Sequence, residues 1–197
     1  MEIVTIIIQA IWLIFPAYVA NASAVIVGGG KPIDSGRFYK DGKRLLGDGK
    51  TWRGLLGGTF FGITVGLGMM VLLKYCQSSI SFPLTDFGGY PFMILFFFTL
   101  CFGALLGDII ESFFKRRIGK ERGEDWFVLD QLDFIAGALV FTISASFLVA
   151  WLYPQEGNWF MNTITFSHIL VIVIVTPFVH IATNYVYRKR KGAKYAK

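Results

Sequence analysis

Five long apolar stretches determine what this chain can fold into. They cover residues 3–27, 54–75, 91–110, 134–153 and 165–187. Each is long enough to cross a hydrocarbon core about 30 Å thick as a single helix. Hydrophobic residues make up 54% of the sequence, which is more than a soluble domain usually carries. We therefore expect an all-α integral membrane protein, a single domain over residues 1–197 with five transmembrane helices.

The basic residues lie almost entirely on one side of these predicted helices. Of the 19 Lys and Arg residues, all but Lys74 lie between the first two stretches, between the third and fourth, or after the fifth. The positive-inside rule then places the N-terminus outside and the C-terminus in the cytoplasm, with two long cytoplasmic loops, 28–53 and 111–133. Ten of the 13 acidic residues lie on or beside the same face. Because topology does not require them, we expect a polar site on the cytoplasmic side of the cell membrane.

Small and polar residues within the stretches indicate how the helices pack. Glycine recurs every four residues in two series, Gly54, Gly58, Gly62 and Gly66, and Gly103 and Gly107. This spacing lets membrane helices approach closely. Asn21, near the cytoplasmic end of the first stretch, carries an amide that needs a polar partner, so we expect it to face a polar cavity.

The first long loop contains two Asp-Gly-Lys turns, at residues 41–43 and 48–50. Such turns place backbone N–H groups beside ammonium groups, which suits a polyphosphate. The segment is not a Walker A motif, because Arg44 stands where that motif requires its first glycine. A pair of ordinary turns is the alternative interpretation.

Charged residues around the second long loop follow helix periodicity. Three of them share one face with Ser112 if the third helix continues beyond residue 110: Asp108, Lys115 and Arg116. Asp130 and Asp133 project to one side of the fourth helix, and convergent carboxylates suit magnesium. Helix capping is the alternative, but it accounts for one acid rather than three at the edge of an apolar domain. We therefore predict a magnesium site at Asp108, Asp130 and Asp133.

Three segments of the chain carry a resemblance to a known family. They are PAYVANA at 16–22, GGGKPIDSGRFYKDGKRLLGDGKTWRGLLGG at 28–58 and GDIIESFFKRRIGKERGEDWFVLDQLDFIAGAL at 107–139. With them the sequence resembles the CDP-archaeol synthases, of the cytidylyltransferase superfamily that includes the CDP-diacylglycerol synthases. The resemblance implies transfer of CMP from CTP to the phosphate of an unsaturated archaeal ether lipid, 2,3-bis-O-geranylgeranylglycerol 1-phosphate. The expected products are CDP-archaeol and pyrophosphate, and the expected cofactor is Mg²⁺.

The resemblance also assigns roles to the charged residues. The catalytic set is Asp108, Asp130 and Asp133 as magnesium ligands, with Lys115. The groups expected to bind the phosphates of CTP are Lys50, Thr51, Ser112, Lys115 and Arg116. Further contacts to nucleotide or lipid phosphate are expected from Asn21, Asp41, Lys43 and Arg44, with Asp34 and Asp48 organising the same loop. The expected partners are CTP, the phosphorylated ether lipid and the bilayer, and no nucleic acid.

Two alternatives are compatible with a small membrane protein of this kind. A CDP-diacylglycerol synthase would act on diacyl phosphatidic acid and would differ in the ester linkage of its lipid. A small membrane transporter would place charges midway along its helices at a repeat interface. The five stretches have almost no such charges and show no inverted repeat, which disfavours transport.

Overall fold

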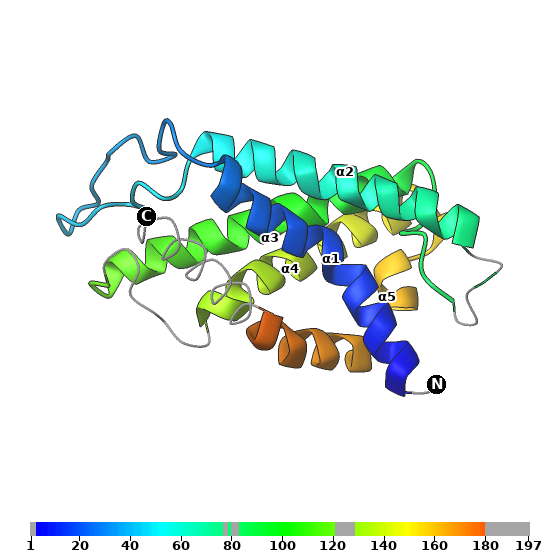
Figure 1. Cartoon of the computed structure of the whole chain (residues 1–197). Helices are drawn as coiled ribbons and strands as arrows, with labels where there is room; N and C mark the ends of the chain where they lie inside the picture. The colour runs from blue at the N-terminus through cyan, green and yellow to red at the C-terminus, as the bar shows by residue number, and fades with distance from the viewer. Residues whose placement is uncertain (1–2, 77–78, 80–82, 121–128, 180–197) are drawn as a thin grey trace, which may run out of the picture.

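The computed structural model is an all-helical bundle, and it describes residues 3–76, 79, 83–120 and 129–179 (Figure 1). Its helices are α1 (Ile3–Val27), α2 (Trp52–Cys76), α3 (Phe92–Arg117), α4 (Leu129–Leu152), the short 3-10 helix η2 (Pro154–Glu156), α5 (Trp159–Thr163) and a further helix, Phe166–Val179. No β-strand occurs within these described ranges, where two isolated bridges join Pro32 to Thr51 and Phe38 to Arg44. The all-α prediction is confirmed.

Four of the helices are long and apolar enough to cross a membrane: α1, α2, α3 and most of α4. The fifth predicted span, 165–187, takes a different form. The segments Pro154–Thr163 and Phe166–Val179 together have the length and composition of a span, but they meet at an angle of 47°. Residues 180–187 of that prediction lie outside the described residues. The chain is thus a multi-pass membrane protein, and its described residues contain four candidate spans, or five if the bent pair counts as one.

Two helices extend further than their apolar stretches. α3 continues to Arg117 instead of ending at residue 110, because neither Gly nor Pro interrupts it before Gly119. Gly119 has φ +84°, the left-handed conformation that commonly terminates a helix. α4 begins at Leu129, five residues before the predicted start at 134. Three acids of the expected loop 111–133 therefore lie on helices, Glu111 on α3 and Asp130 and Asp133 on α4.

Glycines allow α1 and α2 to pack backbone against backbone. A Cβ atom added at Gly58 would lie 2.7 Å from the carbonyl oxygen of Ala20, and one at Gly62 would lie 2.8 Å from that of Pro16. Real Cβ atoms do not come this close to a backbone oxygen, so only glycine permits the contact. The expected role of the glycine series in close packing is confirmed.

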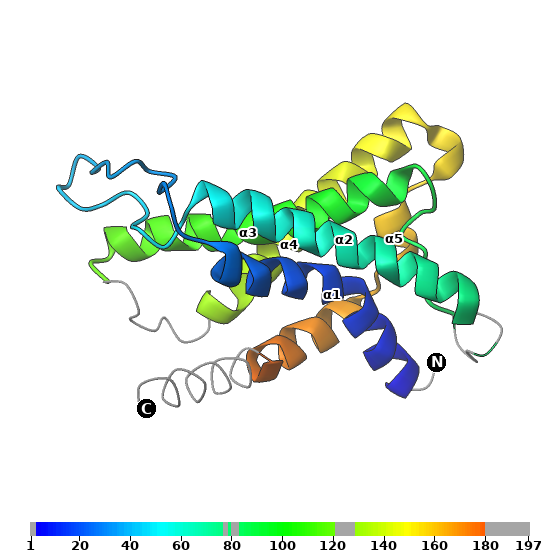
Figure 2. The ribbon, with the colours of Figure 1, turned by 45° about the horizontal axis from the view of Figure 1, so that its top comes forward.

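The charged first loop and the charged ends of α3 and α4 lie toward one end of the bundle, which we call the polar end (Figure 1). The loop between α1 and α2 lies there, beside the last turns of α3, and α4 begins toward the same end (Figure 1). The helix Phe166–Val179 runs toward the same end (Figure 2). It is tied to α1 by Tyr18, whose hydroxyl oxygen lies 2.8 Å from Oγ1 of Thr176. The candidate site is at this polar end.

Candidate active site

A second set of glycine contacts brings α3 and α4 together at the polar end. A Cβ atom at Gly107 would collide with the carbonyl oxygen of Asp133, and one at Gly137 would collide with that of Gly103. Asp108 directly follows Gly107, and Asp133 lies one turn before Gly137. The close approach of the two backbones therefore carries the two carboxylates toward each other.

Three carboxylates meet at this crossing. Asp108 and Glu111 of α3 and Asp133 of α4 each offer an oxygen within 4.8 Å of the others. Glu111 is absent from the sequence-based prediction, although it stands three residues after Asp108, the same spacing that singled out Asp130 and Asp133. Asp130 lies beside this trio, and its Oδ1 is 2.6 Å from Nζ of Lys115.

Two lysines neutralise part of this negative charge. Nζ of Lys50, from the first loop, lies 2.5 Å from Oδ2 of Asp108. Nζ of Lys115 lies 3.2 Å from Oε1 of Glu111 and also contacts Asp130. The Lys115 side chain is only 15% exposed and that of Glu111 only 8%. Removing one partner from such a shielded ion pair leaves a charge without compensation, which is costly.

An open cleft of about 390 Å³ leads to Asp108. Its lining includes Asn21 of α1, Lys50 and Thr51 just before α2, and Asp108 of α3. Its volume lies within the range of about 300–1,000 Å³ that is usual for small-molecule sites. Asn21 therefore lines a cleft that also contains charged side chains. Ser112 is buried on α3, one turn beyond Asp108.

Thr51 stands where the loop becomes helix. Its Oγ1 accepts hydrogen bonds from the backbone N–H groups of Gly54, at 3.1 Å, and Gly29, at 3.2 Å. The first of these is an N-cap interaction that satisfies a free donor in the first turn of α2. Because the second reaches back to the end of α1, Thr51 closes the base of the loop.

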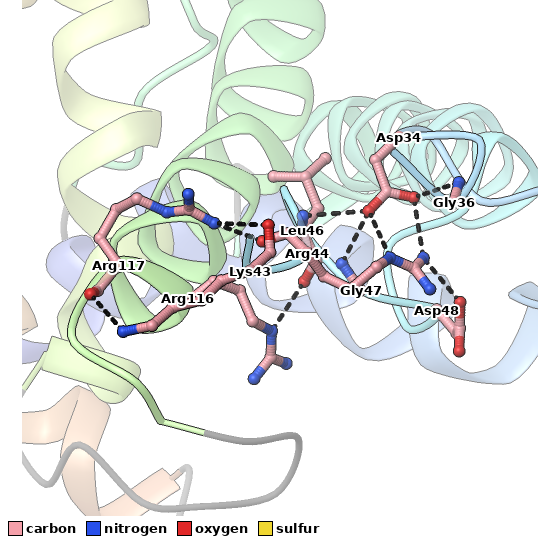
Figure 3. Close-up of polar contacts among 9 residues, drawn as sticks. All are labelled: Asp34, Gly36, Lys43, Arg44, Leu46, Gly47, Asp48, Arg116 and Arg117. Carbon is pink, nitrogen blue, oxygen red and sulfur yellow. Dashed lines mark hydrogen bonds and ion pairs between the residues drawn. The ribbon is translucent and has the colours of Figure 1, made fainter. Parts of the chain in front are cut away.

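Asp34 organises the interior of the first loop, as Figure 3 shows. Its fully buried carboxylate accepts hydrogen bonds from the backbone N–H groups of Gly36, Leu46 and Gly47 and from the guanidinium of Arg44. Burial alone would raise the pKa of Asp34, but these donors outweigh it and hold the pKa well below its ordinary value. Arg44 also pairs with Asp48 at 2.8 Å.

The outer part of the loop contacts the last turn of α3. Nε of Arg116 donates to the carbonyl oxygen of Leu46 at 3.3 Å, and Nζ of Lys43 donates to the carbonyl oxygen of Arg117 at 3.1 Å. Arg117 in turn pairs with Asp41 at 2.7 Å. Three residues expected at CTP or lipid phosphate, Asp41, Lys43 and Arg116, thus contact other protein groups here (Figure 3 includes two of them, Lys43 and Arg116).

Comparison with known proteins gives a consistent result. A family model described as CarS-like, CDP-archaeol synthase, matches residues 3–193. CDP-archaeol synthase of Methanococcoides burtonii is 44% identical over 172 residues, covering 87% of this chain and 93% of that protein. The same-named protein of Thermococcus onnurineus is 45% identical over 177 residues, covering 89% and 88%. A solved intramembrane enzyme for archaeal membrane lipid biosynthesis is 35% identical, with TM-score 0.67 over 91% of this chain and 94% of that chain.

The fold and the charged site together define a class, the multi-pass membrane enzymes with a charged site at one end of the helices. Within that class the sequence match is specific and spans almost the entire chain. The chain belongs to the CDP-archaeol synthase family.

Proposed function

We propose that this enzyme transfers CMP from CTP to the phosphate of 2,3-bis-O-geranylgeranylglycerol 1-phosphate, giving CDP-archaeol and pyrophosphate. The observation that carries the proposal is the meeting of Lys50 with Asp108, Glu111 and Asp133 beside an open cleft. Membership of the CDP-archaeol synthase family supports the choice of nucleotide and lipid.

The chemical difficulty of this reaction is electrostatic. The lipid phosphate is already an anion at neutral pH and needs no strong general base, but it must approach a triphosphate and expel pyrophosphate. Positive groups held in place before the reaction provide most of the acceleration in such transfers. Lys50 can exchange its carboxylate partner for a phosphate oxygen, because it is carried by the loop. Lys115, held between Glu111 and Asp130, keeps two acids oriented.

The carboxylate trio Asp108, Glu111 and Asp133 fits a hard divalent cation such as Mg²⁺. Hard cations prefer oxygen ligands, and all three oxygens lie within 4.8 Å of one another, close enough to share one ion. When bound there, Mg²⁺ would supply positive charge to the phosphates and to the leaving pyrophosphate. In this assignment Glu111 takes the place given to Asp130 by the sequence, because Glu111 offers the oxygen that lies within 4.8 Å of oxygens of both Asp108 and Asp133.

The proposed orientation places the two basic loops and the active site in the cytoplasm, where CTP is available. The lipid chains stay in the bilayer, and the headgroup phosphate reaches the cleft at the membrane boundary. The positive-inside rule supports this orientation, because all Lys and Arg residues except Lys74 lie on one side of the predicted helices. Because CTP does not cross a bilayer, inside-out vesicles should use added CTP, whereas sealed right-side-out vesicles should not.

The reaction is tested with the purified protein, CTP and Mg²⁺, supplied in parallel with the ether lipid phosphate and with diacyl phosphatidic acid. We expect a CDP-lipid from the ether substrate, detected by mass spectrometry, and loss of product on addition of EDTA. Preferential use of the diacyl lipid would instead assign the chain to the diacylglycerol branch of the reaction.

A further inference from the structure

Arg117, the last residue of α3, makes the most extensive side-chain contacts to the first loop. Its guanidinium donates to Oδ1 of Asp41 at 2.7 Å, to the carbonyl oxygen of Lys43 at 3.4 Å and to the carbonyl oxygen of Arg44. These three acceptors belong to one turn of the loop. The fork of a guanidinium can serve several acceptors in one plane, whereas the ammonium of a lysine cannot do so with the same geometry.

Two aromatic rings shield the same guanidinium. Its central carbon lies 4.8 Å from the ring centre of Tyr39 in the loop and 5.1 Å from that of Phe113 on α3. These distances are within the range of cation–π attraction. The Arg117 side chain is 17% exposed, so its contacts are less screened by water than those of a surface ion pair. Arg117 thus joins a ring on the helix to a ring on the loop.

The contacts of Arg117 continue through the loop to the acidic trio. Arg117 fixes the backbone at residues 43 and 44, and the side chain of Arg44 binds Asp34. Asp34 holds the N–H groups of Leu46 and Gly47, the residues before the turn that carries Lys50. Lys50 then reaches Asp108 at 2.5 Å. Each step is a hydrogen bond or ion pair between described residues.

We propose that Arg117 is a positioning residue, which holds the loop 28–51 against α3 so that Lys50 faces the acidic trio and the phosphates of CTP. The proposal rests on the proposed function for its nucleotide, but the docking of the loop is independent of it. In this role Arg117 acts through the loop and not by contact with CTP or the lipid. A loop of this length that was not docked against α3 would lose much conformational entropy each time CTP binds.

The test compares Arg117→Gln and Arg117→Lys with the purified wild-type protein in detergent. We expect the KM for CTP to rise about tenfold or more in Arg117→Gln, as for loss of a charge-assisted hydrogen bond, with the KM for the lipid little changed. Arg117→Lys should raise the KM for CTP less than Arg117→Gln does, because lysine keeps the positive charge but lacks the planar guanidinium that serves several acceptors. Lys40→Gln, an exposed residue of the same loop, is the matched control and should behave as wild type.

Hydrogen exchange without any substrate provides the second measurement. Amides of residues 41–47 should exchange faster in Arg117→Gln and in Asp41→Asn, while amides of α2 and α3 keep their protection. The double variant should add little to Arg117→Gln alone, since both single changes remove the ion pair between Arg117 and Asp41. If exchange and the KM for CTP are both unchanged in Arg117→Gln, the positioning role is wrong. If loop exchange rises but wild-type protein does not use CTP, the positioning role stands and the proposed reaction fails.

Discussion

Asp133→Asn and Asp108→Asn are each expected to lower turnover by on the order of a hundredfold or more, with little change in thermal stability. The size follows from the proposed role, because a ligand that holds a metal at a reacting phosphate contributes several kcal/mol to lowering the barrier, and each 1.36 kcal/mol is about tenfold in rate. Three carboxylates within 4.8 Å repel one another when no cation separates them. Neutralising one should therefore not destabilise the fold, and the ion pair with Lys50 that Asp108→Asn weakens is partly open to solvent. Steady-state turnover and thermal unfolding in detergent measure the two quantities.

Glu156→Gln is the control for this pair, since Glu156 lies on η2, far from the trio in the bundle, and is exposed. It should leave turnover unchanged. Asp130→Asn tests whether Asp130, predicted from the sequence as a metal ligand, has that role. Because Asp130 pairs with Lys115 and is not one of the trio, its substitution should lower turnover less than Asp133→Asn does. The metal assignment would be contradicted if Asp108→Asn and Asp133→Asn both kept more than about a third of wild-type turnover. Such a loss is well below tenfold, and a tenfold loss corresponds to about 1.4 kcal/mol of barrier.

Gly107→Ala should strongly disturb the packing of α3 against α4. The added Cβ would collide with the carbonyl oxygen of Asp133 and lie 3.1 Å from the Cα of Gly137. Backbone atoms cannot rotate away as a side chain can, so the helices must separate. Overpacking of this kind costs about 1–3 kcal/mol or more. A displacement of about 1 Å between Asp108 and Asp133 would also cost on the order of a hundredfold in turnover.

Gly68→Ala is the matched substitution. Gly68 is also helical, on α2, but a Cβ atom there meets nothing within 4 Å. Alanine favours helix over glycine by about 1 kcal/mol, so this variant should be as stable as wild type or slightly more so. Thermal unfolding and monodispersity in detergent compare the two variants. Equal behaviour of Gly107→Ala and Gly68→Ala would show that the close contact between α3 and α4 is not required.

Hydropathy and glycine spacing predict most of this fold. The apolar stretches locate α1 to α4, because the bilayer demands a minimum length of apolar helix. They do not locate the helix ends, since α3 continues through seven polar and apolar residues to Arg117 once backbone hydrogen bonding is established. The bend of 47° before Phe166 was also not predicted. It depends on how the chain packs around residues 164 and 165, which periodicity does not report.

Single residue types predict the candidate site less completely than the fold. Asp108 and Asp133 were recognised from their position at the edge of apolar helices, but Glu111 was not, although it follows Asp108 by three residues. A single sequence does not indicate that Gly137 and Arg117 have a special role. Their importance depends on what lies opposite them, the backbone of α3 for Gly137 and the turn at 41–44 for Arg117. Such pairings across the fold require a structure.

Transfer of the α-phosphorus of CTP to lipid is the central claim, and labelled nucleotide tests it most directly. The purified protein is given the ether lipid phosphate and Mg²⁺ with CTP labelled either at the α-phosphorus or at the γ-phosphorus. We predict that the α label enters the lipid fraction and that the γ label is released as pyrophosphate. Label from the γ-phosphorus in the lipid, or no label in the lipid from either position, would contradict the proposed cytidylyl transfer.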